Sequence, residues 1–463
     1  MSLPLFLAIK AKPLTKFKVI EILPAICEHQ LNDVYVMKKM RKQSIWYTKL
    51  LGTCEAASSF FAGEFARLLG NSANVPYPKN RVISGEDESV VESGGKEVYI
   101  ASKKIVGFEE MNEQKLHELA TNPSKYAGFG VAVMVKYILE DLDDKLPNLA
   151  DTDGQIVAID FDCCLSELSL PETIEELGLK LDEVSRVSSE DIESLPRLSS
   201  NGFTPYNWLS MKMKGKLWTN SDFAYGDKSA ANSDLVAIGL DPKFRREVNN
   251  TLLNLILLPK ELLSRFLNSY IDPRALEWDQ LCVADLLLDK QIKDILNFFD
   301  KRPDKFKAAA LGSEKFTTYL FAPNSREDLN AMINEILSFK TISNIPLVPP
   351  DQRQIIANQI RANYENLILQ VLENRLKTYR KKIIPLTSTS SPRIFDEKAR
   401  NEKVEEIKIV DIFLSNLKQL FKGEAKPQEL LSLSQLQVLQ NQDELGKIFS
   451  DFSFSKEAQS CCH

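Results

Sequence analysis

Three polar residues with side chains that can bind metal ions or accept protons follow one another in the middle of the chain. Asp143 and Asn148 lie five residues apart, with a lysine between them and a proline just before the asparagine. Asp160 follows Asn148 by twelve residues and ends the apolar run 156–159. Phosphoryl transfer requires a carboxylate near the acceptor hydroxyl, an amide ligand for a metal ion, and a second carboxylate that holds the metal against the phosphates. The order and spacing of these residues therefore predict a phosphoryl-transfer site.

The same residues match two loops of protein kinases in order and register. Asp143 and Asn148 reproduce the catalytic-loop layout D-x-x-x-x-N, and Ile159-Asp160-Phe161 has the layout of the D-F-G metal-binding loop. The sequence therefore resembles the atypical side of the protein-kinase superfamily. It is most similar to the divergent kinase-like type IV secreted effectors of Legionella. It is more distantly similar to HipA and the phosphoinositide kinases, whose loops also precede an I-D-F run.

This resemblance covers residues 30–165 by motif and implies a role for each matching residue. It implies that Asp143 is the catalytic base or orients the acceptor hydroxyl. It also implies that Asn148 is a metal ligand and that Asp160 is the main metal ligand. ATP and Mg or Mn are the cofactors that such a site requires.

The sequence departs from the kinase pattern at several positions. No glycine occurs before Gly52, so a glycine-rich phosphate-covering loop is missing. Leu142 replaces the basic residue that precedes the catalytic aspartate, and no A-P-E sequence closes the activation segment. Asp162 stands where the metal loop normally has glycine, and it is either a second metal-site carboxylate or a solvated turn residue. These departures leave an inactive pseudokinase open as an alternative.

The residues before the two loops offer partners for the phosphates. In the predicted strand 34–40, alternation can direct one ammonium at the nucleotide while the neighbouring side chains stay in the core. Lys38 is the preferred residue because the two valines of the strand share its face, and Lys39 would serve if the other face lines the pocket. The helix that follows should present a glutamate to this lysine. Glu64 is preferred over Glu55 because it lies among apolar residues.

The segment 99–108 takes the place of the hinge between the two lobes of a kinase. By its position, the backbone around Ser102, Lys103 and Lys104 is expected to contact the adenine of ATP.

The elements that must position these residues form a small mixed part followed by a larger helical part. Strand patterns at 17–22 and 34–40, a helical pattern at 56–69 and a strand pattern at 97–101 give the order strand, strand, helix, strand. Beyond Gln114 helical patterns dominate, interrupted by strand candidates at 148–149 and 155–159 and followed by helices at 244–270, 274–300 and 325–340. The predicted fold class is α+β, a bilobal protein-kinase-like fold with an N-lobe at residues 1–105 and a helical C-lobe at 106–345.

Residues 346–463 are predicted to form a separate, all-α appendage. A long helix is expected from Asp351 to about Lys382, with further amphipathic stretches at 404–421 and 427–449. The segment 375–382 holds five cations in eight residues. Cations commonly stabilise the C-terminal end of a helix dipole, and they can also contact anionic lipid headgroups. A phosphoinositide or inositol polyphosphate contact through this region is therefore a second interpretation.

The composition excludes several classes of protein. Lys and Arg total 58 against 64 Asp and Glu, and the net charge of -6 gives no overall attraction to nucleic acid. The seven cysteines are scattered, and the adjacent pair Cys163-Cys164 has poor disulfide geometry, as expected for a reducing cytosol. No stretch reaches the roughly 20 apolar residues needed to cross a bilayer, so an integral membrane protein is not expected.

The sequence thus predicts an atypical ATP-dependent protein Ser/Thr kinase. The resemblance implies a secreted bacterial effector that acts on a host protein in the host-cell cytosol or peripherally at a membrane. One such relative depends on inositol hexakisphosphate, which implies a similar activator here. Two alternatives stay open: a pseudokinase scaffold that binds membrane phosphoinositide or a host protein, and a kinase-fold enzyme that transfers AMP or phosphorylates a lipid.

Overall fold

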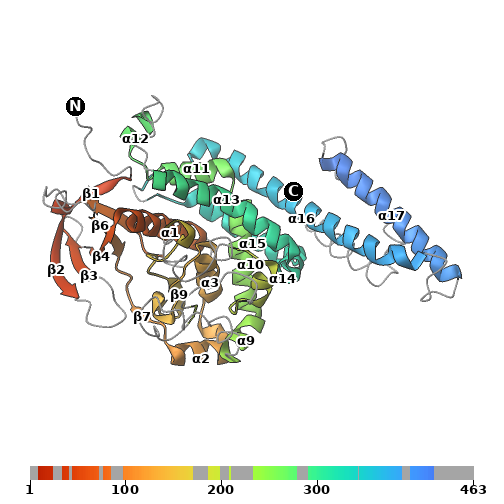
Figure 1. The fold of residues 1–463 in the computed structure, drawn as a ribbon, viewed down its shortest axis with the longest axis horizontal. Coiled ribbons are helices and arrows are strands. Elements are labelled where there is room, and N and C mark those ends of the chain that lie inside the picture. The colour runs from red at the N-terminus through yellow and green to blue at the C-terminus, as the bar shows by residue number, and fades with distance from the viewer. Residues whose placement is uncertain are drawn as a thin grey trace. The chain divides into compact units, whose positions relative to one another are not determined.

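The computed structural model describes residues 9–23, 34–40, 44–71, 77–84, 97–169, 186–198, 208–209, 233–278, 290–341, 344–387 and 397–421. The chain forms two compact units. The first comprises Met1–Lys315 and Asn330–Ala357, and the second comprises Phe316–Leu329 and Asn358–His463. The first unit contains a sheet-rich N-terminal part and a helical part, so the α+β class is confirmed (Figure 1).

A six-stranded sheet forms the N-terminal part of the first unit. Its strands are β1 (Ala11–Pro13), β2 (Phe17–Leu23), β3 (Val34–Lys39), β4 (Ile45–Gly52), β5 (Asn80–Ser84) and β6 (Glu97–Lys103). The strand order is β1-β5-β6-β4-β3-β2, in which β1 and β5 are parallel and all other neighbours are antiparallel. The order predicted from the sequence was wrong, because it missed β1, β5 and also β4, which directly precedes the first long helix.

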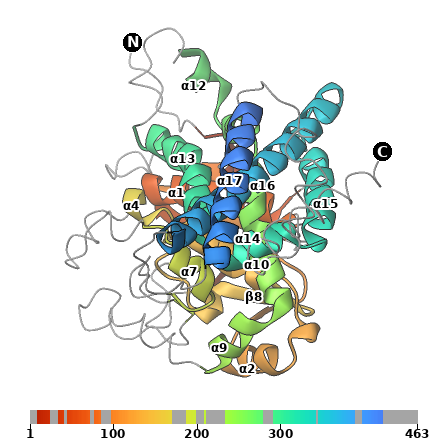
Figure 2. The same ribbon diagram turned by 90° about the vertical axis from the view of Figure 1, so that its right-hand side faces the viewer.

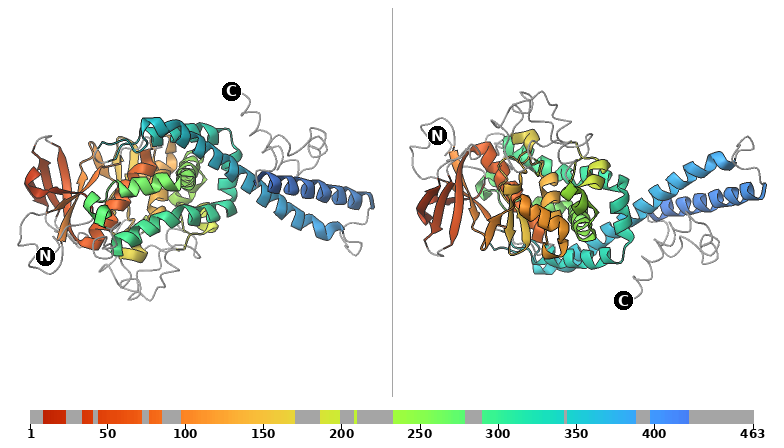
Figure 3. Two further views of the ribbon diagram at one scale, coloured as in Figure 1. Left: turned by 90° about the horizontal axis from the view of Figure 1, so that it is seen from above. Right: turned by 90° about the horizontal axis from the view of Figure 1, so that it is seen from below.

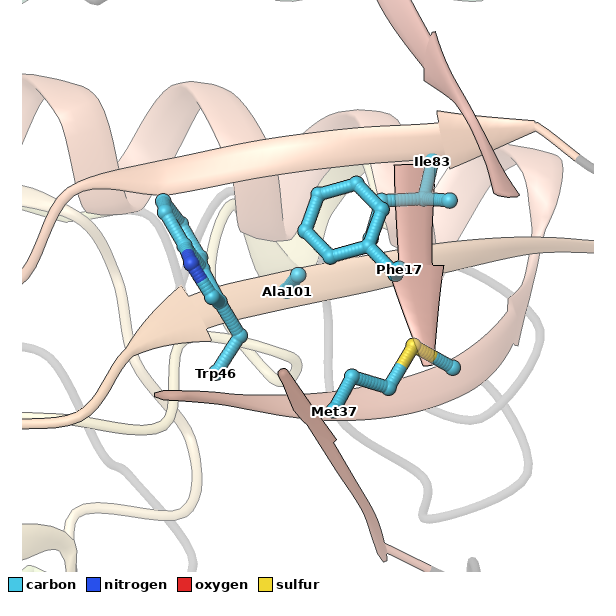
Figure 4. Packing of buried hydrophobic residues seen from close by; sticks show 5 residues of the cluster. All are labelled: Phe17, Met37, Trp46, Ile83 and Ala101. Atoms are coloured by element: carbon cyan, nitrogen blue, oxygen red, sulfur yellow. The ribbon is translucent and has the colours of Figure 1, made fainter. Parts of the chain in front are cut away.

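One face of this sheet buries an apolar cluster from five strands (Figure 4). Its members are Phe17, Met37, Trp46, Ile83 and Ala101. The rings of Phe17 and Trp46 meet edge to face, with centroids 6.3 Å apart. Because side chains alternate along a strand, filling this face turns the intervening residues of β3, β4 and β6 to the other face.

The other face is covered by α1 (Thr53–Asn71), which packs against β4, β5 and β6. Its buried side includes Phe60, Phe61 and Phe65. Gly63 brings the helix close to β5, since a Cβ at this position would lie 2.3 Å from the side chain of Asn80. The helix thus lies directly after β4 and against the strands that follow it.

A second, three-stranded antiparallel sheet has the order β7-β8-β9. Its strands are β7 (Phe108–Glu110), β8 (Leu149–Thr152) and β9 (Gln155–Ala158). The predicted tight turn at Asp153-Gly154 is confirmed, and both residues have positive φ, at 54° and 84°. Such a turn matches the twist of the two strands that it joins.

The helical part of the first unit contains further described helices. They are α2 (Glu113–Thr121), α3 (Phe129–Ile138), α4 (Ser166–Ser169), α7 (Ser189–Ser194), α9 (Ser233–Leu240), α10 (Pro242–Leu257), α11 (Lys260–Asn268), α12 (Pro273–Trp278) and α13 (Lys290–Gly312). All residues of α3 are buried, and the helix packs against α10 and β9. Figure 2 shows α9 beside α2, and the two helices are in contact. The predicted helix at 244–270 is divided at Pro259 into α10 and α11.

The C-terminal helices are α14 (Glu314–Phe321), α15 (Asn324–Ser338), α16 (Arg353–Ile383) and α17 (Glu397–Phe421). Short 3-10 helices occur at Leu14–Lys16, Pro123–Lys125, Leu146–Asn148, Pro350–Gln352 and Ile384–Thr387. Within the second unit, α16 and α17 lie side by side (Figure 3), and the hydroxyl of Tyr379 donates to the carboxylate of Glu406. The amphipathic stretch predicted at 427–449 lies outside the described residues.

Several cations at the end of α16 have partners inside the second unit. The guanidinium of Arg375 stacks on the ring of Phe321 at 4.8 Å. Arg380 forms an ion pair with Asp411 at 2.5 Å. These contacts explain part of the basic cluster at 375–382 by internal packing. Within the described chain, no helix combines the length and apolar character that crossing a bilayer requires.

Gly130 is expected to be essential for the packing of α3 on α10. A Cβ at this position would lie 2.6 Å from the carbonyl oxygen of Phe244 and 2.8 Å from the Cβ of Glu247. Gly130→Ala should therefore force the two helices apart and lower the free energy of unfolding by about 1–3 kcal/mol. Urea unfolding monitored by circular dichroism measures the change.

Ala308→Ser, at an exposed position of α13, is the control and should lower the free energy of unfolding only by the difference in helix propensity, about 0.5 kcal/mol. If Gly130→Ala were as stable as the parent protein, the close packing of α3 and α10 would be wrong.

Candidate active site

The loop between α3 and β8 brings Asp143 and Asn148 together. The Nδ2 of Asn148 donates to the carbonyl oxygen of Asp143 at 2.5 Å and approaches its Oδ2 at 3.4 Å. Lys145 donates from Nζ to the same carboxylate oxygen at 2.9 Å. Because the nitrogen end of the Asn148 amide makes these bonds, its oxygen is the end suited to a metal ion. The structure thus places the two residues in the relation that the D-x-x-x-x-N spacing predicts.

The loop after β9 lies directly against this one. The N–H of Ile159 donates to the carbonyl oxygen of Asn148 at 2.9 Å, and the N–H of Leu142 donates to that of Cys163 at 3.2 Å. These bonds flank Asp160, which has a φ of 58°, in the left-handed region that non-glycine residues rarely adopt. The predicted catalytic and metal-binding loops therefore form one local structure.

A lysine from the six-stranded sheet reaches this structure. The Nζ of Lys49, on β4, lies 2.6 and 2.8 Å from the two carboxylate oxygens of Asp160. It also lies 3.0 Å from Oδ2 of Asp162. The three side chains are 25%, 29% and 24% exposed, so solvent or a ligand can reach the pair of carboxylates. The ion pair links residues that are 111 positions apart.

The charges of these groups shift their pKa values in different directions. Partial burial disfavours the carboxylate of Asp160, but the ammonium of Lys49 outweighs it and holds the pKa at about 2. At Asp162, burial and the charge of Asp160 outweigh Lys49 and raise the pKa to about 6. Burial also disfavours the Lys49 ammonium, but the two carboxylates raise its pKa above the usual value. Lys49 and Asp160 are thus a stable ion pair near neutral pH.

The lysine at Asp160 is not the one expected from the sequence. Lys38 lies on β3 opposite Ile45, on the same face of the sheet as Lys49. Ile45 is four residues from Lys49 along β4, so the Cα of Lys38, on the neighbouring strand, lies about 14 Å from that of Lys49 at the usual rise per residue and strand spacing. Lys39 lies opposite Phe17, on the face of the apolar cluster. The structure therefore replaces both residues by Lys49 as the cation beside Asp160.

Glu64 also has different partners from those expected. Its carboxylate is fully buried and accepts hydrogen bonds from the N–H of Asn80 at 2.8 Å and the hydroxyl of Tyr270 at 2.8 Å. Arg67 forms an ion pair with it at 2.7 Å. Glu64 thus joins α1 to the start of β5 and to the helical part, and these bonds occupy it in place of a strand lysine. Glu55 lies half-buried in the first turn of α1.

The predicted hinge residues lie at the end of β6, and several of their polar groups are already engaged. Ser102 donates from its hydroxyl to the side chain of Asn80 at 2.5 Å. The N–H of Lys103 donates to the carbonyl oxygen of Lys79, and that of Lys104 donates to the carbonyl oxygen of Ile45. These two N–H groups hold the sheet together. They are therefore not available to adenine in this conformation.

A pocket of about 590 Å³ lies beside the hinge segment. It is lined by Tyr77, Pro78, Lys79, Lys103, Lys104, Ile105, Val106, Thr152, Asp153 and Gln155. Neither Lys49 nor Asp160 is among the lining residues, so this pocket is separate from the carboxylates.

The donor set fits a metal ion that is held jointly by protein and nucleotide. Among the described residues, no group of three or more His, Cys, Asp or Glu side chains could hold a metal ion by itself. Mg²⁺ in nucleotide sites commonly has only one or two carboxylate ligands and takes the others from phosphates and water. Asp160, which stays ionised, and the amide oxygen of Asn148 are ligands of this kind. Asp162 could supply a second carboxylate.

The sequence contained signals for some of the residues that it did not identify. The run Ile45-Trp46-Tyr47-Thr48 has strong strand propensity, and Gly52 ends it just before α1. This pattern could have identified a third strand and its lysine. A second signal is Lys145, which lies between Asp143 and Asn148 in the sequence. The pairing of Lys49 with Asp160 itself has no local signal.

Comparisons with known proteins give little further information. No protein-family model matches the sequence, and no curated protein matches it. Among solved structures, the proinflammatory kinase CtkA of Helicobacter pylori matches with 11% sequence identity and a TM-score of 0.29. The match covers 65% of this chain and 95% of that chain. A TM-score this low does not establish a shared fold, and none of these comparisons connects the chain to the Legionella effectors.

Asp162 is expected to make the stability of the protein depend on pH. Its pKa of about 6 in the folded protein lies above the ordinary 3.8, so the folded state binds this proton more tightly than the unfolded state between those pH values. Stability is therefore lost as the pH rises through this window. Between pH 5 and pH 8 this group should lower the free energy of unfolding by about 1–2 kcal/mol.

Urea unfolding at the two pH values tests this, because Asp162→Asn removes the titrating group and should reduce the loss. Asp160, with its lowered pKa, stabilises the protein above pH 4 and contributes no change in this range. Asp300→Asn, on the exposed side of α13, is the control and should keep the parent's pH dependence. An Asp162→Asn protein with the parent's pH dependence would show that the assigned cause is wrong.

Proposed function

We propose that this protein is a kinase-fold phosphotransferase that binds ATP together with Mg or Mn. The observation that carries the proposal is that Lys49 contacts Asp160 where the Asp143–Asn148 loop adjoins the metal loop. A strand lysine, a loop aspartate with its asparagine, and a second aspartate after a short hairpin are the parts that phosphoryl transfer needs, in the order in which kinases use them. The strand that carries Lys49 directly precedes the helix that covers the sheet, as in the small lobe of a kinase.

Each residue has a role that follows from its position. Lys49 turns from the carboxylates to the phosphates when nucleotide binds, because its flexible and partly exposed side chain permits this movement. Asp143 orients the acceptor hydroxyl and receives its proton. Lys145, beside Asp143, stabilises the negative charge of the phosphoryl group in transit. Asp160 and Asn148 hold the metal ion, which supplies the positive charge that shields the phosphates.

The base of the nucleotide is expected to lie under β4 and the segment after β6. Tyr47 shares the face of Lys49 because it lies two residues before it on the strand. Since the N–H groups of Lys103 and Lys104 are engaged in the sheet, main-chain contacts to the base move to the following Ile105 and Val106. The hydroxyl of Ser102 is likewise engaged, with the side chain of Asn80, so the contact to the base that was expected at Ser102 also moves to the following residues.

The acceptor and the biological setting are narrower proposals. The resemblance to secreted effector kinases supports a Ser or Thr acceptor on a host protein, action in the host-cell cytosol or at a membrane, and activation by inositol hexakisphosphate.

Autophosphorylation with labelled ATP tests the activity, with Mg or Mn and with or without the inositol phosphate. The intact mass of a modified substrate separates phosphate transfer from AMP transfer. Calorimetry with ATP and Mn that detects no binding would favour the pseudokinase scaffold.

Two lysine substitutions distinguish the structural assignment from the one based on sequence. Lys49→Met should lower the rate of ATP-dependent transfer by about 100-fold or more, because it removes the charge nearest Asp160 and the phosphates. Lys38→Met is the matched variant and should have a much smaller effect. Lys38 lies opposite Ile45, which is four residues from Lys49 along β4. Single-turnover assays with saturating ATP and Mn measure both rates.

Asp160→Ala should abolish transfer in the same assay. If Lys38→Met were the more damaging lysine variant, the assignment from the sequence would be restored. If Asp160→Ala kept full activity, the metal assignment would be refuted.

A further inference from the structure

Lys136 is a buried charge that the proposed reaction does not use directly. It lies in the last turn of α3, and its side chain is fully buried. Its Nζ donates to Oδ2 of Asp141 and lies 3.9 Å from Asp144. Burial disfavours the ammonium, but these carboxylates outweigh it and raise the pKa of Lys136 above its usual value. The residue is therefore charged in the folded protein.

The same ammonium contacts the backbone of the metal loop. The Nζ of Lys136 donates to the carbonyl oxygen of Asp160 at 2.9 Å and lies 4.9 Å from the centre of the Phe161 ring. Asp160 has a φ of 58°, a backbone conformation that is unfavourable for a non-glycine residue. A charged hydrogen bond to the carbonyl group of this residue stabilises the strained conformation. That conformation is the one in which its carboxylate meets Lys49.

Lys136 is also tied to the catalytic loop. Its partner Asp141 accepts a hydrogen bond from the N–H of Asp143 at 3.0 Å. One buried ion pair therefore contacts the backbone of Asp143 at one end and the backbone of Asp160 at the other. Kinases ordinarily have a basic residue just before the catalytic aspartate, and here that position is occupied by Leu142.

We propose that Lys136 is the positioning residue of this site, and that with Asp141 it holds the metal loop in its binding conformation before any metal arrives. This inference rests on the proposed function, since it concerns how Asp160 is presented to a metal and nucleotide. The position before Asp143 is occupied by Leu142, which carries no charge. In this proposal Lys136, from α3, supplies the cation that supports the loops. It also explains why a lysine stands at a fully buried position of an otherwise apolar helix.

A purely structural role is the main alternative. A buried ion pair can often be replaced by apolar residues with little loss of stability, so packing alone does not require a lysine here. Backbone hydrogen bonds join the two loops on either side of Asp160, from Ile159 to Asn148 and from Leu142 to Cys163. Lys136, in contrast, bonds to Asp160 itself. The two interpretations differ in whether metal binding or only stability depends on Lys136.

The parent protein gives the first test. Hydrogen exchange of the segment 159–165 should be slow without metal and should change less than about two-fold when Mn and ATP are added, because the loop is already in place. A large slowing on addition of Mn and ATP would show that the metal orders the loop, and it would overturn the proposal. This measurement needs no variant, so it tests whether the loop is ordered before metal binds even if substitutions at Lys136 prevent folding.

The second test removes both Lys136 and Asp141, so that neither of these two partners is left charged without the other. Lys136→Met combined with Asp141→Asn should weaken binding of Mn-ATP at least about ten-fold in calorimetry, as loss of a residue that orients a metal ligand typically does. ATP binding without metal should change much less, which a general loss of folding would not produce. The matched control is Arg302→Met combined with Glu140→Gln. It removes another buried ion pair, with N···O 2.5 Å, that contacts α3 but not Asp160.

The control should bind Mn-ATP like the parent, even if thermal unfolding shows an equal loss of stability. If both double variants bind Mn-ATP like the parent, Lys136 is a structural residue and only this inference fails. If the parent itself binds no Mn-ATP, the proposed function fails and the inference fails with it.

Discussion

The site depends on charge compensation at the point where a strand and two loops meet. Five aspartates and three lysines lie in this small region: Asp141, Asp143, Asp144, Asp160, Asp162, Lys49, Lys136 and Lys145. Because carboxylates are in excess by two, the lysines alone cannot neutralise them. Buried or half-buried charges are costly unless they are paired. The arrangement is therefore stable only with protons or additional cations.

The pKa shifts show how the structure meets this requirement. Burial and the charge of Asp160 raise the pKa of Asp162, and burial raises that of Asp144 well above its usual range. Asp160 is the exception, because Lys49 keeps it ionised. Raised pKa values show that the region carries an excess of negative charge when these carboxylates ionise. A divalent cation would compensate the same excess. Asp160, which Lys49 keeps charged, is the carboxylate that the sequence motif assigns to the metal.

Sequence reasoning succeeded where the relevant residues are close in the chain. Asp143 and Asn148 meet because five residues form one turn, and Asp160 joins them because a tight hairpin returns the chain to the same place. The choice of lysine failed because alternation along a strand shows which residues share a face but not where the strand lies in the sheet. Lys38 does share the face of Lys49. Only the strand order, which depends on contacts far apart in sequence, places Lys49 at the carboxylates.

Glu64 illustrates the same limit from the other side. Glu64 was chosen because it lies among apolar residues of the helix, and it is indeed buried, but burial does not identify its partner. Its bonds come from α1 itself, from the start of β5 and from Tyr270, which lies 206 positions away. Only Arg67, three residues after Glu64 on the same helix, has a spacing that a local pattern could reveal. Burial could be predicted from composition, whereas the hydrogen-bonding geometry required the tertiary structure.

The departures from the kinase pattern acquire a different meaning once these contacts are known. A vestigial site would be free to lose its buried charges, because apolar replacements are often as stable or more so. This chain instead keeps Lys136 fully buried and joined to Asp141, and it keeps a strained Asp160 beside it. The basic group that is absent beside Asp143 enters from α3, one element earlier in the chain. Under the function proposed above, Lys136 would support the metal loop from α3 in place of a basic residue beside Asp143.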